Sequence, residues 1–178
     1  LNENKLNSQL LSDYLNPIHF VKSLKTKEDI ILYNPVKGTK ITKKLISMNR
    51  DLKFIPLQNL SNNQVQDLFK RAKLYIDFGN HPGKDRMPRE AVMADCCIIT
   101  GKKGSASNDE DVSIPQRYKF DDNKILASNL FRETVLDVFL NYEKNVLSFS
   151  DYKGIIENEY TVFKNQVNSI FKTILYEK

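Results

Sequence analysis

The chain has 178 residues, a net charge of +5 and a pI near 9.1. This length allows one domain with a sizeable core, whereas no apolar run approaches the roughly 20 residues of a membrane span. No signal peptide is visible, and two adjacent cysteines exclude a disulfide framework. We therefore expect a cytoplasmic protein with at most peripheral contact with the inner membrane face. The positive charge suits an anionic ligand, and no nucleic-acid partner is expected.

Buried apolar runs alternate with segments of helical periodicity along most of the chain. Residues 1–28 are polar with scattered apolar positions, and we expect a connector that packs on a domain formed by residues 29–178. Strands are predicted at residues 29–34, 52–57, 73–78 and 96–100, with helices between them. This alternation predicts an α/β fold with a Rossmann-like parallel sheet, flanked by helices and joined by right-handed crossovers.

The helix boundaries carry their own signals. Thr39 is a candidate N-cap for the first helix. Ser61 and Gln64 have the spacing of a capping box before the second helix. Residues 155–176 are predicted to form the longest amphipathic helix of the chain.

The segment from His81 to Glu90 is dense in glycine, proline and cations. It lies between strand 73–78 and a short helix expected from Ala91, so it leaves the carboxyl end of a strand, where open α/β sheets bind ligands. Gly83 allows a ligand to approach the backbone, and the helix start offers free N–H groups. Cations suited to phosphate flank this helix start: Lys84, Arg86 and Arg89.

Two further features support an anionic nucleotide ligand. Glu90 is expected just inside the helix, where a carboxylate is favoured and can accept hydrogen bonds from sugar hydroxyls. A second glycine-rich loop, residues 101–107, follows the next strand and does not match a Walker A motif. Gly104 and Ser105 in this loop are candidate phosphate or sugar contacts, and a mobile surface loop is the competing interpretation.

Asp77, His81 and Asp85 are spaced four residues apart, which suggests a metal site. One histidine and two loop carboxylates, beside competing lysine and arginine, make a poor ligand set. We therefore expect no metal here.

Residues 89–99 resemble the donor-site helix of GT-B glycosyltransferases, and most of all those that build bacterial surface polysaccharides. The family pattern begins with Glu-Ala, matched here by Glu90 and Ala91, and ends with two aliphatic residues. Asp95 and Cys97 replace the Gly and Pro of that pattern. Pro82 stands where the family often has a second glutamate that contacts the donor sugar, so His81 or Asp85 would have to substitute for it. The resemblance covers roughly residues 30–145.

The resemblance implies a reduced GT-B C-terminal domain with Glu90 on the nucleotide ribose. Lys37 and Gly38 match the Lys-Gly that commonly ends the family's first donor-domain loop, which would bring Lys37 to the diphosphate; a solvated turn lysine is the competing interpretation. His81 would hydrogen-bond the donor or its own loop. Lys84 and Arg86 are the catalytic candidates, because cations stabilise the negative charge that develops on a leaving diphosphate.

The implied activity is transfer of a sugar from a nucleotide-diphosphate sugar to a glycan or lipid-linked acceptor, with no cofactor. An N-terminal acceptor domain is a further implied partner. One alternative is a non-catalytic nucleotide-sugar-binding or interaction module of the same fold, which Pro82 favours. Another is a response-regulator-like or phosphatase-like domain, although the chain lacks the acidic cluster that Mg²⁺-dependent phosphoryl chemistry requires.

Overall fold

The computed structural model describes residues 9–22, 24 and 26–176 of the chain. Within these residues the core is a five-stranded sheet in the order β2-β1-β3-β4-β5, in which every neighbouring pair is parallel. The strands are β1 (Glu28–Tyr33), β2 (Lys53–Pro56), β3 (Ala72–Asp77), β4 (Cys97–Gly101) and β5 (Lys119–Phe120). The predicted α/β fold with a parallel sheet is therefore confirmed, and the four predicted strands lie within one residue of their expected bounds.

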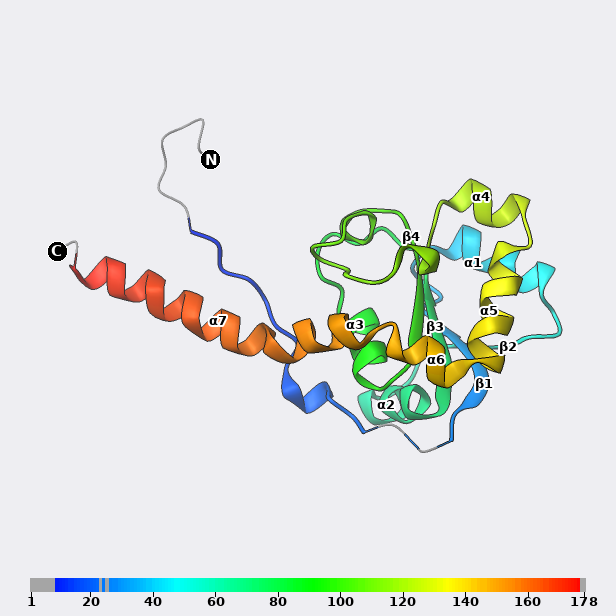
Figure 1. Ribbon diagram of the computed structural model, residues 1–178, viewed down its shortest axis with the longest axis horizontal. Helices are drawn as coiled ribbons and strands as arrows, with labels where there is room; N and C mark the ends of the chain where they lie inside the picture. The colour runs from blue at the N-terminus through cyan, green and yellow to red at the C-terminus, as the bar shows by residue number, and fades with distance from the viewer. Residues whose placement is uncertain (1–8, 23, 25, 177–178) are drawn as a thin grey trace.

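Helices cover both faces of this sheet (Figure 1). They are α1 (Thr39–Met48), α2 (Asn62–Arg71), α3 (Arg86–Met93), α4 (Asp122–Ala127), α5 (Leu130–Leu140), α6 (Tyr142–Leu147) and α7 (Ser150–Tyr176). In Figure 1, α1, α4 and α5 lie on one side of the sheet, and α2 and α3 lie on the other. Short 3₁₀ turns occur at η2 (Pro17–His19), η3 (Ser105–Ser107) and η4 (Gln116–Tyr118).

The central strands are buried on both faces, because helices cover the sheet from two sides. Residues 30–32 of β1, residues 74–76 of β3 and all of β4 are buried. Near-continuous aliphatic runs of this kind are typical of parallel strands. Cys96 and Cys97 are unpaired members of the same core. Burial raises the pKa of Cys96 to about 11, so its thiol is protonated and unreactive at neutral pH.

Helix starts differ from the predictions in two places. The capping box is present, since the Gln64 amide donates to the Ser61 hydroxyl and the Ser61 amide donates to the Gln64 side chain. Thr39, however, is the first residue of α1, and Gly38 occupies the N-cap with a φ of 59°. Helix α3 begins at Arg86 rather than Ala91, so Glu90 lies in its second turn instead of just inside the start.

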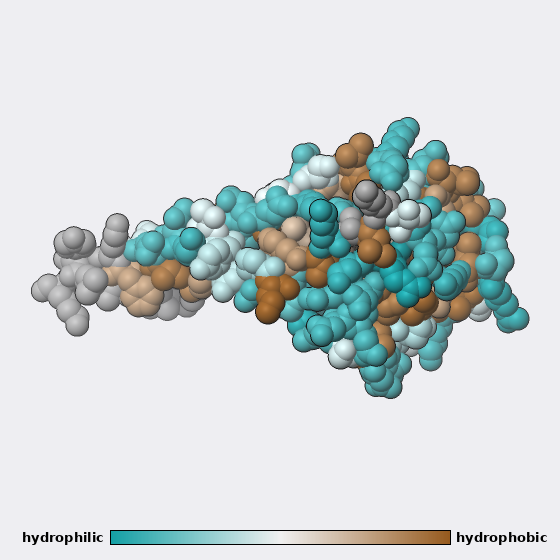
Figure 2. Space-filling model, turned by 90° about the horizontal axis from the view of Figure 1, so that it is seen from below, coloured by the Kyte–Doolittle hydropathy of each residue, from teal (hydrophilic) through white to brown (hydrophobic). Residues whose placement is uncertain are grey.

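Helix α7 is longer than predicted, and its second half projects away from the sheet together with the N-terminal segment (Figures 1 and 2). This segment, residues 9–21, follows α7: the Ser12 amide and hydroxyl both donate to the Gln166 side chain, at 2.8 Å each. Leu15 is buried in the core. The connector predicted for residues 1–28 begins outside the described residues, since 1–8 are not among them. Over the described residues, no helix is both long enough and apolar enough to cross a bilayer.

Candidate functional site

The sheet order reverses between β1 and β3. In open α/β sheets, the loops that diverge at such a switch point border the binding crevice. From β1 the chain continues to β2 on one side, and from β3 it continues to β4 on the other. Ligands of open α/β sheets bind where loops diverge in this way. The loop after β1 meets the loop after β3 here, with Lys37 Nζ 2.6 Å from Asp85 Oδ2. Their contact requires a glycine, since a Cβ on Gly38 would lie 2.3 Å from the carbonyl carbon of Phe78.

A buried histidine lies between two carboxylates below this contact. His81 is 1% exposed; its Nδ1 is 2.9 Å from Asp85 Oδ2, and its Nε2 is 3.5 Å from Asp77 Oδ1. Asp77 also accepts hydrogen bonds from the Tyr75 hydroxyl and the Gly79 amide. Burial alone would raise the pKa of Asp77, but its contact with His81 and these hydrogen bonds outweigh burial and lower it. Asp77 is therefore a buried anion that anchors the start of the loop.

These three residues also form the only group with metal-ligand geometry that the described part of the chain contains. Each of Asp77, His81 and Asp85 offers one ligand atom, and the atoms lie within 4.8 Å of one another. The ammonium of Lys37, however, already places a positive charge on Asp85. A divalent cation at Asp85 would have to displace it, so the donor set fits a metal poorly.

The second glycine-rich loop supports the first from behind. The Ser105 amide donates to the His81 carbonyl at 2.8 Å, and the Ser105 hydroxyl donates to the Gly83 carbonyl at 2.6 Å. Gly104, with a φ of 55°, packs so closely that a Cβ would lie 2.0 Å from the His81 oxygen. Gly83 itself has open space where its Cβ would be. The Ser105 hydroxyl is thus engaged by the loop, while the backbone at Gly83 remains open to a ligand.

Glu90 lies on α3 beside basic side chains from two segments. Its Oε1 is 3.1 Å from Arg86 Nε in the same helix, and 3.0 Å from His19 Nδ1 in the N-terminal segment. Glu90 is only 4% exposed. Burial raises its pKa above the ordinary value, although Arg86, His19 and Arg89 act in the opposite direction. An ionised carboxylate is a strong hydrogen-bond acceptor, so Glu90 has the chemistry to bind hydroxyl groups.

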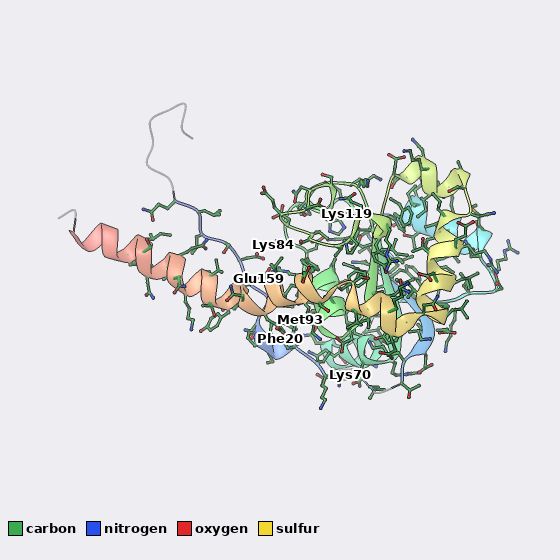
Figure 3. All side chains as sticks on the ribbon, in the orientation of Figure 1. Phe20, Lys70, Lys84, Met93, Lys119 and Glu159 are labelled. Carbon is green, nitrogen blue, oxygen red and sulfur yellow. The ribbon has the colours of Figure 1, made fainter. Side chains whose placement is uncertain are left out.

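Lys84 and Arg89 reach a different partner, Glu159 on α7. Lys84 Nζ is 3.4 Å from Glu159 Oε1, and Arg89 Nη1 donates to Glu159 Oε2 at 2.8 Å. Figure 3 shows Lys84 and Glu159 next to each other, where α7 passes the loop. Both predicted catalytic cations, Lys84 and Arg86, therefore lie beside carboxylates.

The structure brings the predicted residues together in two groups. The first surrounds the β1–β3 crevice and includes Lys37, Gly38, His81, Gly83, Asp85, Gly104 and Ser105. The second comprises Lys84, just before α3, with Arg86 and Glu90 on α3.

Sequence reasoning missed His19 and Glu159. Glu159 does leave a signal, because it interrupts the apolar stripe of α7 between Ile156 and Phe163. His19 lies in an irregular segment, where no periodicity points to it.

Neither a protein-family model nor a curated protein matches the chain. Among solved structures, the crystal structure of Anabaena Alr3699/HepE in complex with UDP-glucose matches with a TM-score of 0.59 and 10% sequence identity. The match covers 92% of this chain and 57% of the HepE chain, so the chain spans little more than half the length of that protein. At this identity the likeness establishes the fold alone, a Rossmann-like parallel sheet flanked by helices.

Proposed function

We propose that the chain is the nucleotide-sugar donor-binding part of a glycosyltransferase, which transfers a sugar to a glycan or lipid-linked acceptor. The observation that carries this proposal is the meeting of two glycine-containing loops at the β1–β3 switch point, with Lys37 beside Asp85. The fold shared with a UDP-glucose complex supports the same ligand class.

In this proposal the cations exchange partners when the donor binds. Lys37 leaves Asp85 and Lys84 leaves Glu159, so that both ammonium groups reach the diphosphate. Each lysine is partly exposed, with 34% and 23% of the side chain accessible, and partly exposed ion pairs are weak enough to exchange. Arg86 joins them at the start of α3, and Glu90 accepts hydrogen bonds from the ribose.

The chemistry assigned to these groups is stabilisation of the leaving group. Breaking the glycosidic bond of the donor leaves a nucleoside diphosphate with additional negative charge, and fixed cations stabilise that charge as it develops. The base that activates the acceptor would come from the portion of the protein that this chain does not include. The proposal assigns no step to a metal, because Lys37, Lys84 and Arg86 supply the positive charge that stabilises the leaving diphosphate.

Calorimetric titration with UDP, GDP, ADP, TDP and UDP-glucose tests the proposal. At least one ligand should bind to the wild type, and binding should weaken as ionic strength rises. Lys37→Ala should weaken it, whereas Lys43→Ala, on the exposed face of α1, should not. The absence of binding by all five ligands to folded protein that includes the remaining portion would refute the proposal.

A non-catalytic binding module remains the second candidate, and one observation favours it. Pro82 is exposed at the position of the family's sugar-contacting glutamate, and its ring offers no hydrogen-bond donor or acceptor. Donor turnover by the longest native form of the protein separates the two candidates, since a binding module retains nucleotide affinity without producing free nucleoside diphosphate.

A further inference from the structure

The guanidinium of Arg89 is buried and joins three separate segments of the chain. Its Nη1 donates to Glu159 of α7 at 2.8 Å, and its Nη2 donates to Asp13 of the N-terminal segment at 2.9 Å. The third segment is the ligand loop itself: Nη2 donates to the Lys84 carbonyl at 2.8 Å, and Nε donates to the Asp85 carbonyl at 3.3 Å. Arg89 therefore binds the backbone of the loop directly.

Glu159 is the counterpart of Arg89, and it is equally buried, with 4% of its side chain exposed. Besides Arg89, it accepts a hydrogen bond from the Leu15 amide at 2.9 Å and lies 3.4 Å from the ammonium of Lys84. A buried carboxylate with three donors has one well-defined position. Removing its charge leaves Arg89 buried without its principal partner, which carries a large penalty.

This pair is connected to the crevice through Asp85. The backbone of Asp85 is held by Arg89, and its side chain contacts both Lys37 and His81. A shift of α7 is therefore transmitted to the loop through Arg89, and from Asp85 in the loop to Lys37 after β1. The positions of Lys37 and Lys84 thus depend on a residue of α7.

We propose that Glu159 is a positioning residue of the donor site, which acts through Arg89 to fix the loop at Lys84 and Asp85. This inference rests on the proposed function for its consequence, the affinity for the donor, but its geometry is independent of that function. It also makes α7 part of the support of the site, through Glu159.

The test compares Glu159→Gln with Glu157→Gln in the full chain. Both changes remove one negative charge from α7, but Glu157 is exposed. Two amides report loop position: Gly79, which donates to Asp77, and Ser105, which donates to His81. Hydrogen exchange at both amides, measured where the variants are fully folded, should be about tenfold faster or more in Glu159→Gln, as expected for loss of one charge-assisted contact. In Glu157→Gln, exchange should equal that of the wild type.

Affinity for UDP-glucose is the second measurement, and it should fall by about tenfold in Glu159→Gln alone. If Glu159→Gln does not fold, Glu159→Asp takes its place in the test. This variant keeps the negative charge but shortens the side chain by one methylene, so exchange and affinity should show smaller changes of the same sign. A lower melting temperature with unchanged exchange and unchanged affinity would overturn the inference. If the wild type itself does not bind UDP-glucose, the proposed function fails, while the exchange rates still decide whether Glu159 positions the loop.

Discussion

Glu90 has two possible tasks, and one substitution separates them. If Glu90 binds the ribose, Glu90→Gln should weaken binding of UDP-glucose by about 1–3 kcal/mol, because a charge-assisted hydrogen bond is lost. If Glu90 only supports its helix, through its contact with Arg86, the same substitution should lower the melting temperature and leave the affinity for UDP-glucose unaltered. Calorimetric titration and thermal unfolding of this one variant decide the matter. Glu133→Gln, on the exposed face of α5, is the control.

The buried carboxylate of Asp77 predicts a dependence of stability on pH. The pKa of Asp77 is lowered in the folded protein despite burial, mainly by the contact with His81. Its contribution to the free energy of unfolding is therefore fully present at a pH above the pKa of the unfolded state, and it is lost as the pH falls through the pKa of the folded state. Asp77→Asn should therefore reduce the free energy of unfolding at pH 7 by about 1–3 kcal/mol. Denaturant titrations should show this difference shrinking below about pH 4.

Asp67→Asn serves as the comparison for this experiment, because Asp67 pairs with Lys70 on the exposed surface of α2. Its effect should stay within about 0.5 kcal/mol at either pH. A difference between the wild type and Asp77→Asn that persists unchanged at pH 3 would contradict the assignment of Asp77 as an anion.

At the scale of elements, continuous burial makes three of the strands easy to predict from the sequence. The strands β1, β3 and β4 are recognisable because both of their faces are covered, which removes polar residues from the run. The two residues of β5 and the six residues of α4 are too short for periodicity to be detected. The predicted site residues follow from loop composition, whereas the ion pairs of Arg89 join positions that are distant in sequence. No local pattern encodes such contacts.

The contact between the two glycine-rich loops gives a prediction at this scale. Gly104→Ala should destabilise the protein by more than 1 kcal/mol, because its φ is positive and its Cβ would collide with the His81 oxygen. Gly154→Ala, within α7 and with open space around it, should instead stabilise by about 0.5–1 kcal/mol. Thermal unfolding of both variants tests these two predictions. Equal changes in stability, of the same sign in both variants, would contradict the close approach of the loops.

For the whole molecule, ligand binding should appear as added stability. A ligand that binds only the folded state adds about 2.7 kcal/mol at a concentration of 100 Kd. We therefore expect UDP-glucose to raise the melting temperature, and glucose to leave it unchanged. Inorganic phosphate at equal ionic strength is the control for simple anion binding to a chain of charge +5. An equal rise with phosphate alone would mean that the site recognises charge and not a nucleotide.

The parallel order of the sheet has a consequence for how the chain is made. Among the strands of this sheet, β1 comes first along the chain, yet it lies inside the sheet and needs β3, which follows α1, β2 and α2. A parallel pair cannot close through a tight hairpin, so one edge of β1 lacks its neighbour while the ribosome completes these elements. Contacts between distant segments also slow folding. Chaperone capture of the nascent chain should therefore be greatest before β3 emerges, and should decline once β1 gains this neighbour.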